Sequence, residues 1–502
     1  MATAGMPVPT VAFDTALAAY LINPAQRTPT IEELAYRELG VSLHPADGEN
    51  GDPAAPQGAF DFDGAGGGPD LEASGRRAVA VARLVEPLQA QLEARGSLEL
   101  MAAIELPMVP LLASMEATGI GVDREFLQEF GTNLRRRLGV LEEEIHEAAG
   151  GPFNINSTLQ LREVLFERLD LPVLKKTPKG VPSTDASVLQ KLRTEHAVVD
   201  KLLEYRELEK LRSTYVDAML PLIEEDGRVR GKFNQMAAAT GRLSQEQPNL
   251  QNIPIRSEEG RAIRQAFVAP PGSVFLVADY SQIELRILAH LSGDAGLVEA
   301  FANDLDIHTA TAARINGIAP DEVSVEQRRR AKMVNFGLLY GMEAYGLAQR
   351  LEISRDEAAD QIDAYFAQFP QVRDFMKGIV DEARATGYTT TLLGRRRYLP
   401  ELASSNFRDR QMGERMALNA PIQGAAADII KKAMVELQQA LRSRGLAAEM
   451  LLQIHDELVL EVPDDEFEEV SALTRQVMEN VIQLRVPLRV DIGSGRTLAD
   501  AK

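Results

Sequence analysis

The chain has 502 residues, of which 45% are hydrophobic and 25% charged, and it contains no cysteine. This length predicts two to four domains of ordinary globular composition, and the lack of thiols excludes disulfides and thiolate metal sites and favours a reducing compartment. The formal net charge of −20 argues against a protein that binds nucleic acid over its whole surface.

Apolar residues are interrupted often along the chain. No run of about 18 apolar residues occurs, and the N-terminus lacks a cationic start followed by an apolar stretch. We therefore expect a cytoplasmic protein without a membrane span.

The basic residues are unevenly distributed, and acidic runs occur away from them. Cations and amides gather in four segments, 242–264, 328–332, 395–397 and 408–415. Because affinity for nucleic acid depends on the cations that line the groove, this distribution predicts an acidic body with a basic cleft.

The N-terminal part predicts two helices followed by a loop. One apolar helix is expected over 13–21, and a second opens with the capping box Thr30-Ile31-Glu32-Glu33. Residues 42–70 are rich in Gly, Pro, Ala and Asp, which predicts a flexible loop. Its glycines at 64–69 are weak candidates for a phosphate-binding loop, because no strand precedes them and no lysine follows.

Helical periodicity then runs from 72 to about 149, with a short break at 119–122. Its expected core positions are Leu84, Leu88, Leu92, Leu111 and Met115. Another long helical stretch is expected over about 184–224.

From Val229 onward, short β-prone runs alternate with long helices. Strands are expected at 274–278, 450–454, 458–462 and 484–492, and helices at about 283–292, 306–316, 324–340, 355–386, 408–443 and 464–480. This pattern predicts an α+β domain with a small antiparallel sheet and a mostly helical insertion.

Asp279 is the first candidate functional residue, because it ends the apolar run 273–278. An acid at such a strand end points out of the sheet and offers its oxygens to a hard cation, although an ordinary turn residue would give the same pattern. Glu284 completes the pattern Ser281-x-x-Glu284, so a capping box that serves only backbone donors is one interpretation of it.

The helix expected at 324–340 carries the second candidate group. Arg328, Lys332, Phe336 and Tyr340 recur every four residues and so form one slowly winding stripe about 18 Å long. The cations lie at the N-terminal end, where the helix dipole favours anions, and the aromatics lie at the other end. A triphosphate fits the first half and a base the second. The alternative is an amphipathic helix with solvated cations and core aromatics.

A third group, His455-Asp456-Glu457, lies at or near the tip of a predicted hairpin. Adjacent acids repel each other unless a cation or a hydrogen bond offsets the repulsion. A metal site and an ordinary polar turn are therefore both possible interpretations of this group. A metal phosphohydrolase would need further histidine ligands, and the six histidines of the chain supply no second suitable pair.

Amide-rich loops accompany these groups, at 240–244, 248–254 and 419–424. Asn and Gln reach base edges and sugars, and Arg reaches phosphates or minor-groove acceptors, although each loop also fits ordinary turn chemistry. Carboxylates for metal ions, cations for phosphates and aromatics for a base are together the parts that phosphoryl transfer needs.

In combination, these segments resemble the large fragment of the bacterial family A DNA polymerases, the DNA polymerase I group. DYSQIELR, RRRAKMVNFGLLYG and QIHDELVLEVP are similar to the three polymerase motifs and occur in the same order. TGRLS, PNLQNIP, DIHTATA, GRRRYLP and NAPIQGAAAD also match family segments. The similarity runs from about residue 105 to the C-terminus.

The resemblance implies a right-hand architecture with a palm built on an antiparallel sheet and with helical fingers and thumb. The polymerase domain would cover 105–502. Within it the thumb would lie at about 120–225, the fingers at about 290–400, and the palm at about 105–119, 226–289 and 401–502. Residues 1–104 would form a truncated, degenerate 3′→5′ exonuclease-like region with the flexible loop inside it.

The resemblance also implies template-directed DNA synthesis, in which a dNTP is added to a primer 3′-hydroxyl and pyrophosphate is released. Two Mg²⁺ ions, replaceable by Mn²⁺, would be held by Asp279, Asp456 and the Tyr280 carbonyl, with Glu457 nearby and Lys332 as the acid that protonates pyrophosphate. The implied dNTP-binding residues are Arg328, Lys332, Phe336, Tyr340, His308, Glu284 and Gln282. The implied primer–template contacts are Arg242, Asn249, Gln251, Asn252, Arg415, Asn419, Gln423 and His455.

Glu284 thus gains a second interpretation, in which it packs against the sugar with Tyr340 and excludes a 2′-hydroxyl. The expected partners are primer–template DNA and dNTPs, with no membrane. The expected form is a monomer in the bacterial cytoplasm, associated with the nucleoid.

The N-terminal part departs from the family pattern. Residues 13–20 resemble a late segment of the exonuclease domain, but the metal-binding D-x-E segment is missing, and Ala73 to Arg77 lacks the expected Tyr and Asp. Neither proofreading nor 5′ nuclease activity is therefore expected. Because half of their domain is absent, residues 1–40 are expected to be poorly anchored.

Two other functions are considered. A single-subunit RNA polymerase shares the carboxylates and the fingers lysine, although Glu284 and the PNLQNIP loop argue against it. A non-catalytic DNA-binding module with a decayed polymerase fold is the second, and the intact Asp279, Lys332 and Asp456 argue against it.

Overall fold

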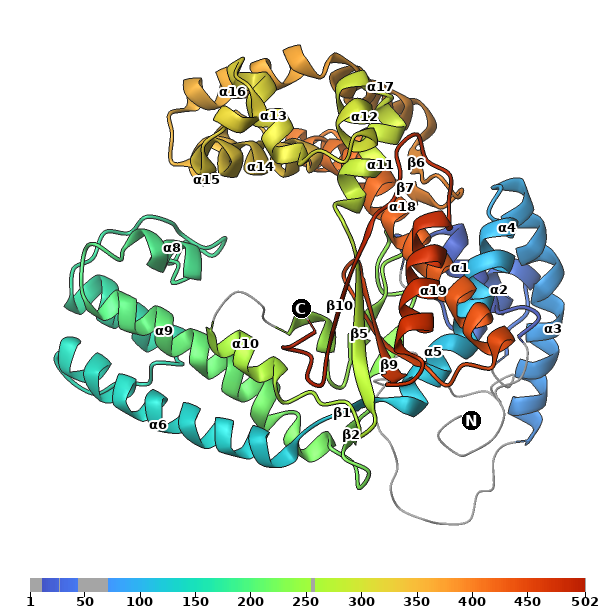
Figure 1. The fold of residues 1–502 in the computed structure, drawn as a ribbon, viewed down its shortest axis with the longest axis horizontal. Helices are drawn as coiled ribbons and strands as arrows, with labels where there is room; N and C mark the ends of the chain where they lie inside the picture. Colours follow the sequence, from blue (N-terminus) through green and yellow to red (C-terminus); the bar gives the residue numbers. More distant parts are fainter. Residues whose placement is uncertain (1–10, 27, 44–70, 254–257, 502) are drawn as a thin grey trace, which may run out of the picture.

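The computed structural model describes residues 11–26, 28–43, 71–253 and 258–501. Nearly all of the loop predicted at 42–70 lies outside these residues. Figure 1 shows a central sheet from which two helical parts project, an upper lobe and a left arm, with further helices packed on the opposite side of the sheet.

The sheet has four antiparallel strands in the order β10-β5-β9-β8. Their bounds are β5 (Ser273–Tyr280), β8 (Glu449–Ile454), β9 (Glu457–Pro463) and β10 (Val490–Gly495). Alternate residues of β5 face two different cores, since Leu276 packs in one hydrophobic cluster and Val277 in the other. Both faces are therefore covered, which explains why these strands have nearly continuous apolar sequences. The three expected strands at 274–278, 450–454 and 458–462 are confirmed. The fourth, expected at 484–492, begins only at Val490 and continues to Gly495.

The upper lobe is helical, and α11 (Ile283–Ser292) connects it to β5 of the sheet. It contains α12 (Ala295–Ala302), α13 (Ile307–Asn316), α14 (Val325–Leu339), α15 (Ala344–Leu351), α16 (Arg355–Gln368) and α17 (Pro370–Thr386), followed by the hairpin of β6 (Tyr388–Thr390) and β7 (Arg396–Tyr398). The single helix expected over 355–386 is two helices, because Pro370 lacks an amide donor and begins α17 instead of continuing α16.

The left arm is built on α6 (Arg124–Ala148) and α9 (Val198–Leu211), which pack against each other. Their buried residues belong to the hydrophobic cluster that also covers one face of the sheet, the cluster that contains Val277. The helical stretch expected over about 184–224 is largely helical, but it is interrupted. It consists of α8 (Ala186–Lys191), α9, a π-helical turn at 212–217 and a 3₁₀ turn at 220–222. The ring of His196 accepts a hydrogen bond from the Val198 amide at 3.2 Å, which caps the start of α9 after the break.

Further elements complete the left arm, connect the parts of the fold or pack behind the sheet. They are α7 (Thr158–Arg162), the π-helical turn Glu163–Arg168, β1 (Ile120–Gly121), β2 (Arg228–Val229), β3 (Lys232–Asn234), β4 (Ser244–Glu246), the 3₁₀ turn Leu250–Asn252, α10 (Glu258–Arg264), α18 (Phe407–Arg444) and α19 (Phe467–Asn480). Behind the sheet, α18 and α19 pack against each other.

The N-terminal helices are packed against the body, contrary to the expectation for this part of residues 1–40; residues 1–10 and 27 lie outside the described residues. These helices are α1 (Thr15–Ile22) and α2 (Ile31–Leu39), and both pack against α3 (Leu71–Ala94). Leu17, Tyr20 and Leu21 of α1 are each only 2% exposed. The periodic leucines of α3 pack in the same hydrophobic cluster. Helix α3 therefore covers the apolar surface of α1.

Among the described residues, one helical run, Leu98–Thr118, is long and apolar enough to cross a membrane by length and composition alone. It comprises α4 (Leu98–Leu100), a π-helical turn (Met101–Glu105) and α5 (Leu106–Thr118). Its apolar residues Met101, Met108 and Met115 pack in the main hydrophobic core, which accounts for the composition of the run.

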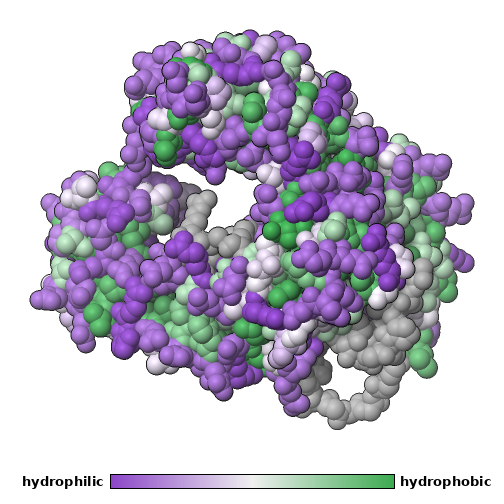
Figure 2. Space-filling view, in the orientation of Figure 1, coloured by the Kyte–Doolittle hydropathy of each residue, from purple (hydrophilic) through white to green (hydrophobic). Residues whose placement is uncertain are grey.

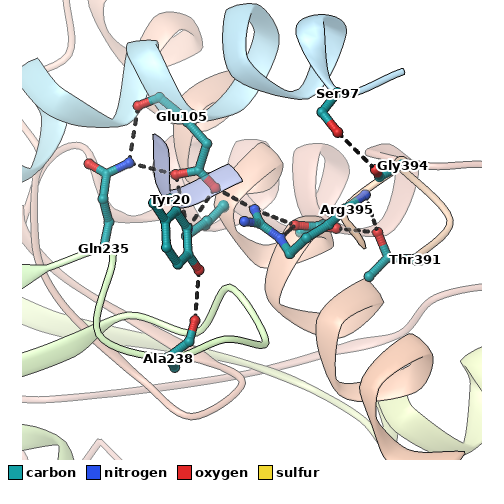
Figure 3. Close-up of polar contacts among 10 residues, drawn as sticks. Tyr20, Ser97, Glu105, Gln235, Ala238, Thr391, Gly394 and Arg395 are labelled. Carbon is teal, nitrogen blue, oxygen red and sulfur yellow. Dashed lines mark hydrogen bonds and ion pairs between the residues drawn. The ribbon is translucent and has the colours of Figure 1, made fainter. Parts of the chain in front are cut away.

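Glu105, in the middle of this run, is fully buried at the centre of an ionic cluster (Figure 3). It pairs with Arg395 and, at 3.0 Å, with Lys431, and Arg395 also pairs with Asp428 at 2.7 Å. Arg395 is 2% exposed, so the prediction that segment 395–397 contributes it to a basic cleft is wrong. Two acids and two bases neutralise one another, which permits charges in the core.

We expect Glu105→Gln to lower the free energy of unfolding by about 3–5 kcal/mol at neutral pH, because two buried cations lose part of their compensation. Burial alone would raise the pKa of Glu105, but the charges and hydrogen bonds of Lys431 and Arg395 outweigh it and lower that pKa to about 2. The ionised Glu105 carboxylate therefore stabilises the fold above its ordinary pKa of 4.5, and this contribution is lost as the pH falls toward 2.

Urea unfolding of the two proteins across this pH range measures both effects. The variant should show a smaller loss of stability on acidification than the wild type. Equal stability at neutral pH would contradict the role given to Glu105.

Candidate active site

Strand register brings the predicted acids together at one end of the sheet. Asp279 of β5 lies directly opposite Glu457 of β9, and Asp456 precedes Glu457 in the turn from β8. The Tyr280 amide donates to the Asp456 carbonyl at 3.1 Å, and His455 adopts a left-handed conformation (φ 54°) to make the turn. Asp279 thus lies within a strand rather than in the turn that was the alternative.

The electrostatics of this group favour a bound cation. The pKa of Asp456 is raised to about 6, first by burial and then by the negative charge of Glu284, with smaller contributions from Asp279 and Glu457, whereas Arg242 opposes the shift. Within the described ranges, no three His, Asp, Glu or Cys side chains are grouped to hold a metal ion by themselves. Two carboxylates nevertheless suit Mg²⁺, which proteins often bind through one or two carboxylates together with substrate phosphates and water.

Glu284 does not form the capping box suggested by its sequence. Helix α11 begins at Ile283 after Gln282, which has left-handed backbone geometry and makes no side-chain cap. Glu284 is 5% exposed and instead accepts hydrogen bonds from Arg242 Nη2 at 2.7 Å and Tyr340 Oη at 2.5 Å. It therefore joins the 240–244 loop to the end of α14.

The predicted stripe on α14 is present, and its two cations differ in their surroundings. Ser324 and Gln327 form a capping box at the start of the helix. Arg328 is exposed and makes a bidentate pair with Asp306, at 2.7 Å to Oδ2 and 3.1 Å to Oδ1. Lys332 is exposed and has no hydrogen bond or ion pair within the part of the chain that the structure describes.

His308 lies beside the aromatic end of the stripe, with ring centroids of His308 and Phe336 5.6 Å apart. The ring is buried, and its pKa is lowered to about 4, mainly by burial and also by the nearby Lys332 and Arg328 charges. Asn335 Nδ2 lies 3.1 Å from His308 Nδ1. Since an amide nitrogen can only donate, Nδ1 accepts and the single proton of the neutral ring is on Nε2.

Sequence reasoning missed two residues that organise this region, Asp306 and Asn335. Asp306 caps α13, accepting from the Thr309 amide at 2.7 Å, and also holds Arg328. An Asp directly before a helix is an N-cap signal that marks such a residue. Asn335 is 1% exposed and bonded to both His308 and Thr311, and only its polarity among apolar neighbours distinguishes it in the sequence.

The candidate nucleic-acid contacts lie on two surfaces near the acids. On α18, Arg415, Asn419 and Gln423 recur every four residues and so share one helix face. On the other surface, Gln251 Nε2 bonds the Gln453 carbonyl at 3.1 Å, and Asn249, Asn252 and His455 are exposed.

A wide hollow with largely hydrophilic walls lies between the upper lobe, the left arm and the body (Figure 2). The predicted basic cleft is only partly correct, because Arg264, like Arg395, is 2% exposed and does not line a surface.

Comparison with known proteins gives the class. Residues 124–500 match DNA polymerase family A, and the chain belongs to this family. DNA polymerase I of Bacillus subtilis (strain 168) is 48% identical over 499 residues, which are 98% of this chain and 55% of that relative. DNA polymerase I of Geobacillus stearothermophilus is 48% identical over 498 residues, 98% of this chain and 56% of that one. The chain therefore spans about half the length of the curated relatives it matches.

A solved structure agrees over nearly the whole chain. The polymerase domain of Pol1 from M. smegmatis, in complex with DNA primer-template and dNTP, has a TM-score of 0.89 and 45% identity and covers 97% of this chain and 82% of its own. The family fold with mixed helix and sheet, expected from the motifs, is thus confirmed.

The raised pKa of Asp456 predicts a pH-dependent affinity for divalent cations. Because a protonated carboxyl is a poor ligand, Mn²⁺ binding should weaken by up to about tenfold per pH unit below a pH of about 6. Titration of the protein with Mn²⁺, followed by electron paramagnetic resonance on both sides of this pH, measures the effect.

Asp456→Asn is the control, and its weaker Mn²⁺ binding should not change through that range. It should also melt at a higher temperature than the wild type above pH 6, since the folded state no longer holds a carboxylate whose charged form is disfavoured. A wild-type affinity that is flat across the range would contradict the prediction.

Proposed function

We propose that this protein catalyses template-directed DNA synthesis, adding dNTPs to a primer 3′-hydroxyl with release of pyrophosphate. The observation that carries the proposal is the meeting of Asp279 and Asp456 at the sheet end, beside Glu284 and Tyr340 at the end of the α14 stripe. The relative solved with primer-template and dNTP has the same fold, which supports the same substrates here.

The three parts of the fold fit a right hand. We assign the sheet to a palm at about 105–119, 226–289 and 401–502, the upper lobe to fingers at about 290–400, and the left arm to a thumb at about 120–225. Primer–template DNA would lie in the hollow between them (Figure 2).

Family A DNA polymerases generally use divalent metal ions, and we propose two Mg²⁺ ions here, replaceable by Mn²⁺. Asp279, Asp456 and the Tyr280 carbonyl would hold them, with Glu457 nearby. Burial, followed by the negative charges of its neighbours, raises the pKa of Asp456, and an added positive charge would offset both effects, which fits this donor set. When bound, such ions make the 3′-hydroxyl more acidic and neutralise charge on the leaving pyrophosphate.

Residues of the upper lobe would bind the triphosphate. Arg328 and Lys332 present their charges from one face of α14, and Lys332 would give a proton to the leaving pyrophosphate. His308 would donate from Nε2 as a neutral ring, since its pKa is about 4. Arg328 must exchange at least part of its pair with Asp306 for phosphate oxygens.

The base and sugar would lie at the other end of α14. Phe336 and Tyr340 would offer ring faces to the nucleotide, and we assign a further contact to Gln282 at the start of α11. Glu284, fixed between Arg242 and Tyr340, would occupy the space that a 2′-hydroxyl needs.

The primer–template end would be held by amides and cations that reach sugar and base edges. We assign this role to Arg242, Asn249, Gln251, Asn252, Arg415, Asn419, Gln423 and His455. Asn419 Oδ1 is buried and has no partner among the described residues, so it is available as an acceptor.

We propose no proofreading for the N-terminal region, because Ala73 to Arg77 lacks the Tyr and Asp of the exonuclease pattern. The proposed form is a cytoplasmic, nucleoid-associated monomer, with the apolar run Leu98–Thr118 serving as a core helix.

Primer extension tests the function directly. With Mg²⁺, dNTPs and a primed template, the wild type should extend the primer, and Asp456→Ala should reduce the rate by at least about a thousandfold, since it removes half of the proposed carboxylate pair. Glu449→Ala removes an exposed acid from β8 of the same hairpin and should leave the rate unchanged. Extension only with ribonucleotides would indicate an RNA polymerase, and DNA binding without extension would indicate a non-catalytic module.

Glu284→Ala should raise ribonucleotide incorporation relative to dNTP by about ten- to a hundredfold, because the space beside the sugar opens. Single-nucleotide insertion with matched rNTP and dNTP gives this ratio. Glu299→Ala, an exposed acid of the same lobe, should not change it. An unchanged ratio in Glu284→Ala would refute the role of Glu284 as a sugar gate.

A further inference from the structure

Arg242 directly follows a tight turn, Ala238–Gly241, which is closed by a hydrogen bond of 3.0 Å from the Gly241 amide to the Ala238 carbonyl. Gly241 has a φ of +85°, which favours glycine over other residues. The geometry of this turn therefore fixes the position of the Arg242 backbone. From there the side chain extends to Glu284, and its Nη2 donates to Glu284 Oε1 at 2.7 Å.

The same carbonyl receives a second hydrogen bond from a distant part of the chain. Tyr20 of α1, 2% exposed, donates its hydroxyl to the Ala238 oxygen at 2.7 Å (Figure 3). A carbonyl has two lone pairs, and here both are used, one by the turn itself and one by Tyr20. Burial raises the pKa of Tyr20 to about 12, so the hydroxyl keeps its proton and remains a donor.

The ionic cluster around Glu105 holds the turn on both flanks. Before the turn, Gln235 Nε2 donates to Glu105 Oε2 at 2.6 Å. At its end, Gly241 lies against Arg395, so that a Cβ at Gly241 would be 2.5 Å from Arg395 Nε. Arg395 cannot give way easily, because Nε donates to Asp428 Oδ1 at 2.8 Å and Nη2 is bonded to Glu105.

We propose that Tyr20 is a positioning residue for the polymerase site, acting through the Ala238–Gly241 turn to place Arg242. The N-terminal helix α1 lies outside the segment 124–500 that matches the family, yet it would serve the reaction by this contact. Loss of the hydroxyl removes one of the two hydrogen bonds that the Ala238 carbonyl accepts, so the turn loosens and Arg242 samples positions away from Glu284 and the primer end. This inference rests on the proposed function.

A double-mutant cycle tests the coupling on the full chain. Tyr20→Phe removes only the hydroxyl and should lower kcat/KM for dNTP insertion about three- to tenfold, the range expected for one lost buried hydrogen bond. In an Arg242→Ala background, the same substitution should change kcat/KM by less than about twofold, because the residue it positions is already absent.

Leu21→Val is the matched control, since it trims the neighbouring buried side chain of α1 without touching the turn. Its effect on kcat/KM should be small and the same in both backgrounds. If Tyr20→Phe fails to fold, Gly241→Ala disturbs the same turn from the Arg395 side and should show the same loss and the same dependence on Arg242.

The outcomes separate this inference from the proposed function. A wild type that does not extend primers would remove the proposed function and this inference with it. An active wild type with an unaffected Tyr20→Phe variant, or with an equal loss in both backgrounds, would overturn the positioning role alone. A loss that disappears when Arg242 is absent supports it.

Discussion

The crowding of carboxylates at one end of the sheet is the constraint on which the rest of the structure depends. The register of β5 against β9 sets Asp279 opposite Glu457, and the turn into β9 brings Asp456 beside them. Like charges in a partly buried place oppose folding, and the raised pKa of Asp456 expresses that cost. Strands buried on both faces hold the register against this repulsion, so the fold maintains a place where a cation is favoured.

Around this centre, Glu284 connects separate parts of the chain. Its two oxygens bind Arg242, from the loop before the sheet, and Tyr340, from the end of α14. Any movement of α14 relative to the sheet must therefore act on Glu284 or break its bond to Tyr340. Because Arg242 also lowers the pKa of Asp456, a single loop influences both the sugar side and the metal side of the proposed site.

The ionic cluster of Glu105, Arg395, Asp428 and Lys431 supports that loop from behind. It joins three segments that are far apart in the sequence, since Asp428 and Lys431 share α18. Helix α1 closes over the cluster, with the ring of Tyr20 5.9 Å from the Arg395 guanidinium. Apolar residues in place of the whole cluster would avoid the cost of removing charges from water, but charged groups with fixed partners impose one arrangement on the segments they connect. The N-terminal helices are therefore part of the same cooperative body as the sheet.

Local features were predicted well where a local physical rule governs them. The stripe of Arg328, Lys332, Phe336 and Tyr340 follows from the helical period, and the strands of the sheet follow from apolar runs that both cores bury. Errors arose where a local rule had a competitor. The sequence around Glu284 fitted a capping box, but its side chain is instead hydrogen-bonded to Arg242 and Tyr340. The helix expected over 355–386 is interrupted at Pro370.

The sequence by itself determined the three motifs, their order and the residue types available for chemistry, because motif spacing within one helix or one hairpin is a local property. Only the tertiary structure decided that Arg395 and Arg264 are buried, that Asp306 holds Arg328, and that Tyr20 touches the turn before Arg242. These contacts join residues distant along the chain, and no periodicity or propensity encodes such a distance. They depend on how strand register and helix packing bring whole elements together.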